Sequence, residues 1–108
     1  MITRVTELIY LKTAMIRTFK NKETEKIFHA EYSARFPREI QKVAYRRLLS
    51  LKAAVTLGDL SALPGNRLEK LKGDRADQHS IRINDRWRIC FEWINGNAEN
   101  VEIVDYHK

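Results

Sequence analysis

The sequence predicts an α+β fold in which two helices pack on one face of an antiparallel sheet. Three observations favour this class. Two segments with helical periodicity lie in the first half of the chain. Short segments in which apolar and polar residues alternate occupy the second half. Tight-turn residues separate these strands, so we expect them to pair as antiparallel neighbours.

The composition of the chain narrows its class. Its 108 residues are enough for one domain, and Lys and Arg number 20 against 14 acidic residues, which gives a net charge of +6. Such a basic domain is expected to bind nucleic acid, another polyanion or an acidic protein. The single cysteine, Cys90, excludes an internal disulfide, and the three histidines show no zinc-site spacing. A reducing cytoplasm fits this cysteine usage. No apolar run approaches the roughly 20 residues of a membrane span, so we expect no membrane partner.

The N-terminal segment is expected to lie outside the core. Residues 1–14 could form a short helix, but an isolated helix of this length is marginal in water. From Met15 to Phe19 the sequence alternates as a first strand does. We therefore predict an N-terminal extension, residues 1–14, followed by one folded domain, residues 15–108.

The first helix is predicted over residues 21–35. Glu23 and Glu25 lie in its first turn, where the helix dipole favours acidic residues. Its apolar stripe is formed by Ile27, Phe28 and Tyr32.

The second helix is predicted from Pro37, a residue suited to the first helical position, to about Thr56, with Gly58 as its stop. Its apolar face consists of Ile40, Val43, Ala44, Leu48, Leu51 and Val55. The opposite face carries Arg38, Lys42, Arg46 and Arg47. A solvated surface is the ordinary interpretation of these four charges, and a docking site for an acidic partner is the alternative.

The remaining residues predict a loop and the rest of the sheet. Residues 58–67 contain a Pro-Gly turn signal, and a short strand follows near residues 68–71. Residues 78–93 alternate on both sides of a three-residue turn, which predicts a β-hairpin. The last strand is predicted over residues 98–105, after an Asn-Gly-Asn turn.

The hairpin register places two arginines directly opposite each other. The apolar pairs expected are Ile81 with Ile89, Ile83 with Trp87, Val101 with Phe91 and Ile103 with Ile89. On the other face, the same register sets Arg82 across from Arg88. Like charges across a ladder destabilise a sheet. A chain that keeps such a pair could do so because an anion binds between them.

The polar face of the sheet is the candidate site. It gathers Arg82, Arg88, Val104 and Tyr106, with His107 at the strand end and Lys72 just before the hairpin. The ordinary interpretation is a solvated face with a few salt bridges. The functional interpretation is metal-free RNA cleavage, in which guanidinium groups hold the phosphodiester while an imidazole, a phenol or an amine transfers protons.

Four motifs in order resemble one protein family. They are Lys72-Gly-Asp-Arg75, Ser80-Ile-Arg-Ile-Asn84, Trp87-Arg-Ile89 and Val104-Asp-Tyr-His107. Together they are similar to the HigB toxins of bacterial toxin–antitoxin systems, in the RelE-like superfamily, and the similarity runs from Met15 to His107. The resemblance implies a microbial-RNase-like α+β fold with a curved sheet. It also implies ribosome-dependent cleavage of messenger RNA in the aminoacyl site, without a metal or an organic cofactor.

The resemblance implies partners as well. It predicts a cognate helix-turn-helix antitoxin, the ribosome with its messenger RNA, and operator DNA bound only through the antitoxin complex. Two alternatives remain open beside the toxin. The chain could be a non-catalytic module that binds RNA or an acidic protein, or a degenerate toxin that acts through its antitoxin complex.

The resemblance assigns roles to five residues. Arg88 matches the arginine of the Trp-Arg motif and would stabilise charge on the pentavalent phosphorus. His107 would transfer a proton, and Tyr106 would position the nucleotide. Lys72 would hold substrate phosphate, and Asp105, which the register turns to the core side, would orient His107 or a backbone group.

Further basic residues are expected to bind RNA. The family varies at the position of Arg82, so its predicted contact with RNA rests only on its place opposite Arg88 in the register. Arg75 and Lys70 flank Lys72 and are expected to contact RNA as well. The chain departs from some members at Glu69 and Lys70, where those members place a histidine.

Overall fold

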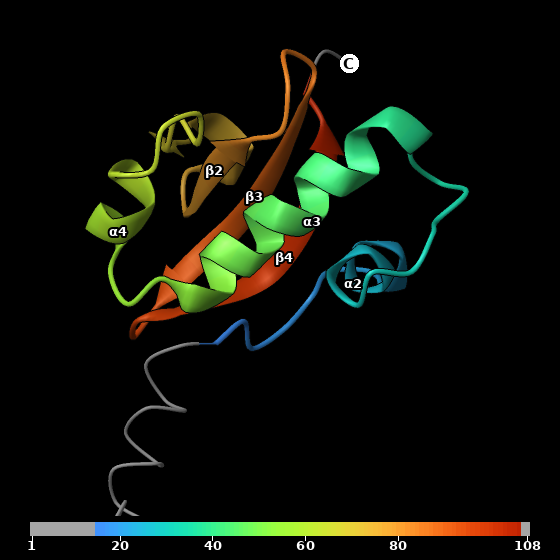
Figure 1. Ribbon diagram of the computed structural model, residues 1–108. Coiled ribbons are helices and arrows are strands. Elements are labelled where there is room, and N and C mark those ends of the chain that lie inside the picture. The colour runs from blue at the N-terminus through green and yellow to red at the C-terminus, as the bar shows by residue number, and fades with distance from the viewer. Residues whose placement is uncertain (1–14, 107–108) are drawn as a thin grey trace, which may run out of the picture.

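The structure, a computed structural model that describes residues 15–106, contains one four-stranded antiparallel sheet with helices on one face (Figure 1). The strands lie side by side in chain order: β1 Glu69–Lys70, β2 Gln78–Arg82, β3 Trp87–Ile94 and β4 Asn97–Asp105. The helices are α2 Lys22–Phe28, α3 Arg38–Ala53 and α4 Leu57–Ser61, and a 3-10 turn covers Gly73–Arg75. The α+β class is therefore confirmed. The extension predicted over residues 1–14 lies outside the described residues.

Helix α2 begins where the sequence predicts and ends early. The Asn21 side chain accepts a hydrogen bond of 2.8 Å from the Thr24 amide and caps the helix. At the other end, Ala30 adopts a left-handed φ of 61°. The amide of Glu31 then bonds to the carbonyl of Lys26 at 2.8 Å, which closes a Schellman motif. The predicted extension to residue 35 is therefore wrong, and Tyr32, expected on the apolar stripe, is exposed.

Helix α3 follows the predicted pattern except at its ends. Pro37 is the residue before the helix and not its first helical residue. The predicted apolar residues Ile40, Ala44, Leu48 and Leu51 are buried. Val55 is exposed, because the helix ends at Ala53, two residues before it.

Helix α4 occupies the first part of the loop predicted at residues 58–67, and the predicted Pro-Gly turn at residues 64–65 is confirmed. Gly58 lies inside this helix, so its predicted role as a stop is wrong. A capping box starts the helix: Thr56 accepts from the Asp59 amide at 3.2 Å, and Asp59 accepts from the Thr56 amide at 3.0 Å. Five residues are too few to show a helical period, which is why the sequence pattern missed this helix. Within residues 15–106, no helix is long and apolar enough to span a membrane.

The core lies between α3 and the sheet (Figure 1). Its fully buried members from the sheet are Ile81, Ile89, Phe91, Ala98 and Val101. Residues Ala44, Leu48 and Leu51 of α3 pack against them and are also fully buried. Burial of apolar side chains contributes about 25 cal/mol per Å² removed from water, so this layer is a favourable contribution to folding.

The predicted hairpin register is confirmed. Ile81 pairs with Ile89, and Arg82 pairs with Arg88. The next strand pairs Ile89 with Ile103, also as predicted. The turn is closed by the Ile83 amide, which donates to the Trp87 carbonyl at 2.9 Å.

A β-bulge interrupts the pairing of β3 with β4. The register shifts between Cys90 and Glu92, and Asn100 on β4 has a left-handed φ of 53°. The predicted pair of Phe91 with Val101 falls at this shift, and both side chains remain buried in the core.

The first predicted strand, 15–19, pairs with β4 through isolated parallel bridges. Ile16 is bridged to Ala98, and Phe19 is bridged to Val101. The Lys20 amide donates to the Val101 carbonyl at 2.9 Å. This segment therefore lies along the edge of β4, although too few bonds form for a regular strand.

Replacing Leu48 should test the core directly. Leu48 is 0% exposed, whereas its neighbour Leu49 is 38% exposed. We expect Leu48→Ala to lower the free energy of unfolding by about 2–5 kcal/mol, because it removes buried methyl groups and leaves a cavity. The matched control, Leu49→Ala, should change it by about 0.5 kcal/mol or less. Urea unfolding followed by circular dichroism would measure both, and equal effects would contradict the assigned helix face.

Candidate functional site

The candidate site lies on the sheet face opposite α3. Strand alternation sends Ile89 and Phe91 toward the helix, and Arg88 and Cys90 to the other face. That face is less open than the sequence predicts, because Ser80 and Cys90 on it are fully buried. Residues 66–75 are tied to this part of the sheet by hydrogen bonds, among them the bond from the Arg82 amide to the Asn66 carbonyl at 2.6 Å.

Arg88 is held from three directions. Its Nε donates to Ser80 Oγ at 2.7 Å, and its Nη2 donates to the Arg67 carbonyl at 2.7 Å. Its guanidinium carbon lies 5.6 Å from the centre of the Tyr106 ring. A guanidinium has five N–H donors, and these bonds to described residues use two of them. Arg88 is therefore preorganised and keeps donors for an anion.

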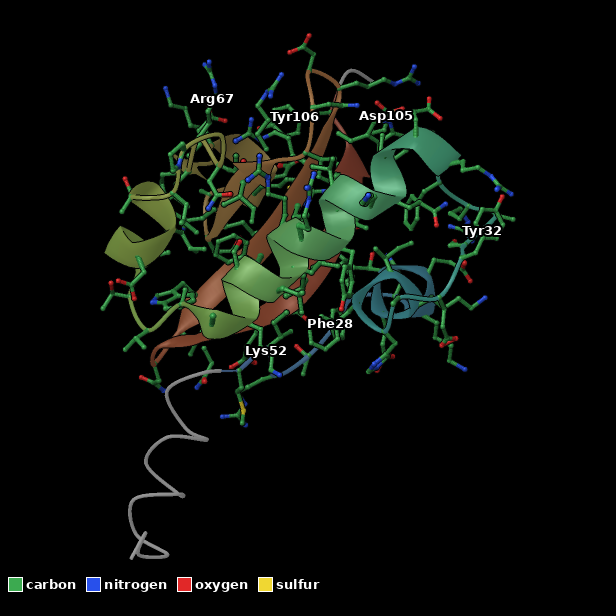
Figure 2. All side chains as sticks on the ribbon, viewed as in Figure 1. Phe28, Tyr32, Lys52, Arg67, Asp105 and Tyr106 are labelled. Carbon is green, nitrogen blue, oxygen red and sulfur yellow. The ribbon has the colours of Figure 1, made fainter. Side chains whose placement is uncertain are left out.

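Tyr106 lies beside Arg88 at the end of the chain that the structure describes. Figure 2 shows Tyr106, Asp105 and Arg67 at the same end of the molecule, where α3 begins and β4 ends. The Tyr106 side chain is exposed. His107, the predicted proton-transfer residue, lies outside the described residues.

A hollow of about 340 Å³ adjoins Tyr106. It is lined by Tyr106 and by residues Glu69, Lys70, Leu71 and Lys72. The structure thus brings Lys72 and Tyr106, two predicted site residues, to one depression. Glu69 lines it as well, so an acidic residue adjoins the two lysines, Lys70 and Lys72.

Arg82 faces Arg88 in the register but has its own partner. Its Nη2 forms an ion pair with Asp85 in the hairpin turn. Asp85 therefore compensates for one of the two facing charges, and no bound anion is required to explain the pair. The Arg82 carbonyl also accepts a hydrogen bond of 3.1 Å from Arg47 Nε. The sequence had suggested that Arg47 belongs to a solvated surface, and this contact shows that it does not.

Arg75 and Lys70, the other two residues predicted to contact RNA, both have partners within the protein. Arg75 Nη1 donates to Gln78 at 2.9 Å and forms an ion pair of 3.3 Å with Glu102. Lys70 Nζ donates to the Ala76 carbonyl at 2.7 Å.

Asp105 has a partner that the sequence pattern did not predict. Arg86 Nε donates to Asp105 Oδ1 at 3.0 Å, and Arg86 Nη2 donates to Oδ2 at 2.7 Å. These bonds and the carboxylate charge raise the pKa of the Arg86 guanidinium. The register that pairs Trp87 with Asp105 could have indicated this contact, because it places the turn beside the end of β4.

One further side chain is excluded from proton transfer, and no metal cluster is found among the described residues. Burial raises the pKa of the Cys90 thiol to about 11, so it is not a thiolate at neutral pH. Within residues 15–106, no three His, Cys, Asp or Glu side chains are placed to share a metal ion. Arginine, lysine, tyrosine and carboxylate groups are what the described site offers.

Comparisons with known proteins match nearly the whole chain. A family model described as the RelE-like toxin of type II toxin–antitoxin system HigB matches residues 17–107. Toxin HigB-1 from Vibrio cholerae is 37% identical over 95 residues, which are 87% of this chain and 99% of that protein. Endoribonuclease HigB from Proteus vulgaris is 33% identical over 93 residues, or 86% of this chain and 100% of that protein. An uncharacterized protein from Haemophilus influenzae is 27% identical over 73 residues, or 68% of this chain and 72% of that protein.

His79 should make stability depend on pH. Its ring stacks on the Phe91 ring, with 6.2 Å between the ring centres. Its buried Nδ1 has no hydrogen-bond partner among the described residues. Burial, and then the charge of Lys70, lower the pKa of His79 in the folded chain. In the unfolded chain the histidine pKa is about 6.5, so as the pH falls the unfolded chain binds a proton before the folded chain does. Acid therefore lowers the stability of the folded chain.

We expect the melting temperature to fall between about pH 7.5 and 5.5 and this fall to shrink in His79→Gln. The control is Leu49→Ala, an exposed position without a titratable side chain. That variant should keep the wild-type dependence. Identical pH profiles for wild type and His79→Gln would contradict the assignment.

Proposed function

The chain belongs to the family of HigB-like, RelE-like toxins of type II toxin–antitoxin systems, and on that premise we propose that it is a ribosome-dependent endoribonuclease. It cleaves messenger RNA in the aminoacyl site and so inhibits translation and growth. The observation that carries the proposal is Arg88, fixed by Ser80, Arg67 and Tyr106 on the sheet face away from α3. Membership of the family supports RNA as the substrate, and the held guanidinium of Arg88 supports its role as the phosphate-binding group.

The reaction is an in-line displacement within the RNA. The ribose 2′-oxygen attacks the adjacent phosphorus and loses its proton to a base, while the bond from phosphorus to the 5′-oxygen breaks. A general acid protonates the departing 5′-oxygen. The products are a 2′,3′-cyclic phosphate and a 5′-hydroxyl, so neither a water molecule nor a cofactor enters this step.

Arg88 stabilises the charge that develops on the pentavalent phosphorus. Preorganised donors act most strongly there, because they need no rearrangement when the charge appears. Arg88 meets this condition, since Ser80 and the Arg67 carbonyl hold its guanidinium before substrate arrives.

Proton transfer falls to residues at the chain end. His107 is the proton-transfer group, Tyr106 positions the nucleotide, and Lys72 holds phosphate in the hollow that it shares with Tyr106. Lys70 lines the same hollow, and its positive charge attracts the RNA backbone. Arg82 and Arg75, although paired with Asp85 and Glu102, are further residues that contact the RNA in this proposal.

The partners follow from the same premise. A helix-turn-helix antitoxin binds and neutralises the protein, and operator DNA is bound only through that complex. The protein acts in the cytoplasm, where the ribosomes are. A non-catalytic, degenerate toxin that acts through its antitoxin complex is the alternative function. It is favoured by Glu69, which lines the hollow together with Lys72 and whose negative charge would repel RNA.

Arg88→Lys should separate catalysis from binding. Lysine keeps the positive charge but lacks the planar guanidinium, which donates to Ser80 and to the Arg67 carbonyl at the same time. We expect cleavage of ribosome-bound messenger RNA to fall about 100- to 1,000-fold, with little change in unfolding free energy. The control Arg46→Lys, exposed on α3, should keep wild-type activity. A folded wild-type protein that does not cleave would support the non-catalytic alternative.

Two substitutions at the chain end should test the assigned roles. His107→Gln removes the proton-transfer group, so we expect a loss of about 100- to 10,000-fold and relief of growth arrest in bacteria. Tyr106→Phe keeps the ring beside Arg88 and should retain most activity, whereas Tyr106→Ala should not. Cleavage sites mapped by primer extension would measure both. Full activity of His107→Gln would remove the residue from the mechanism.

A further inference from the structure

Arg86 fastens the end of β4 to the hairpin turn through three hydrogen bonds. Its guanidinium donates to both carboxylate oxygens of Asp105, at 3.0 and 2.7 Å. Its backbone carbonyl accepts the amide of Tyr106 at 2.7 Å. One turn residue therefore holds two consecutive residues at the end of the chain.

This fastening lies where the strand would otherwise come loose. The last ladder pair of β3 with β4 joins Trp87 to Asp105, and Tyr106 lies beyond it. Chain ends are poorly ordered unless contacts tie them down. Tyr106 is exposed, so its contact with the Arg88 guanidinium alone would restrain it weakly.

The ion pair is unlike an ordinary surface pair. Most exposed pairs contribute little to stability, because solvent screens them and long side chains lose entropy. Here the Arg86 side chain is 60% exposed, but the Asp105 side chain is only 12% exposed, and the contact is bidentate. A fork that contacts both oxygens sets the direction of the carboxylate and therefore of the strand end.

We infer that Arg86 is a positioning residue of the cleavage site: it fixes Asp105 and Tyr106 so that Tyr106 stays against Arg88. The inference rests on the proposed function. Arg86 acts through its neighbours, since its guanidinium is already engaged by Asp105. Loss of its side chain leaves Arg88 on Ser80 and Arg67, and leaves the Tyr106 amide on the Arg86 carbonyl. It removes the bidentate contact that orients Asp105, and the neighbouring Tyr106 shifts with the strand end.

The first experiment measures cleavage by purified ribosomes loaded with messenger RNA. We expect Arg86→Ala to lower the maximal rate about 10- to 100-fold, because small displacements of catalytic groups are costly. The apparent KM should stay within about two-fold, since a positioning residue does not bind the RNA. Arg86→Lys should be impaired as well, because a lysine cannot make the bidentate contact. A large rise in KM with an unchanged maximal rate would overturn the inference in favour of direct RNA binding.

A charge swap and a matched control make the test specific. Arg86→Asp combined with Asp105→Arg should recover at least about ten-fold over Arg86→Asp alone, since the pair is re-formed in the reverse sense. The control is Arg17→Ala, which breaks an exposed pair of 3.9 Å with Glu99 elsewhere on β4. Arg17→Ala should cleave as wild type does. A swap without recovery, or equal loss in the control, would overturn the positioning role.

A second readout does not depend on cleavage. In ¹H–¹⁵N NMR spectra of the full chain, Arg86→Ala and Arg86→Lys should shift the Tyr106 amide and leave the Leu48 and Phe91 amides unchanged. If wild type cleaves and Arg86→Ala cleaves equally well, the inference fails and the proposed function stands. If wild type does not cleave, the proposed function fails, and an unshifted Tyr106 amide would then overturn the inference separately.

Discussion

The alternation of side chains along β3 is the constraint on which the rest of the structure depends. Ile89 and Phe91 point toward α3 and are fully buried, and Arg88, between Trp87 and Ile89, points to the opposite face. Core and site are thus two faces of one strand. A slip of one residue would bury a guanidinium and expose the apolar set, so the free energy of the core also holds Arg88 in place.

The arginine charges around this strand are compensated unequally. Arg82 is paired with Asp85, and Arg75 is paired with Glu102. Arg88 is held instead by a hydroxyl and a carbonyl, which fix its direction without cancelling its charge. The guanidinium that the proposed mechanism needs most is therefore the one that keeps its full charge for the phosphate.

The site is completed by segments that are far apart in the sequence. The Arg67 carbonyl comes from the segment after α4, and residues 69–72 line the hollow next to Tyr106. Tyr106 itself comes from the end of β4, where Arg86 holds it. Such a site at the end of a chain depends on local fastening, because the packed core ends before it. This is why an exposed ion pair can matter more for geometry than for stability.

The sequence by itself determined the α+β class, the hairpin register and the opposed Arg82 and Arg88, because period-two alternation is a local property that few alternatives can satisfy. The family motifs, which are also local, indicated Arg88 and the chain end as the site. Only the tertiary structure decided which charges are paired. The contacts of Arg88 with Arg67 and of Arg75 with Glu102 join segments that meet only in the fold, and no periodicity within one segment encodes the distance between them. Helix α4 escaped prediction for a different reason, because its five residues are too few to show a helical period.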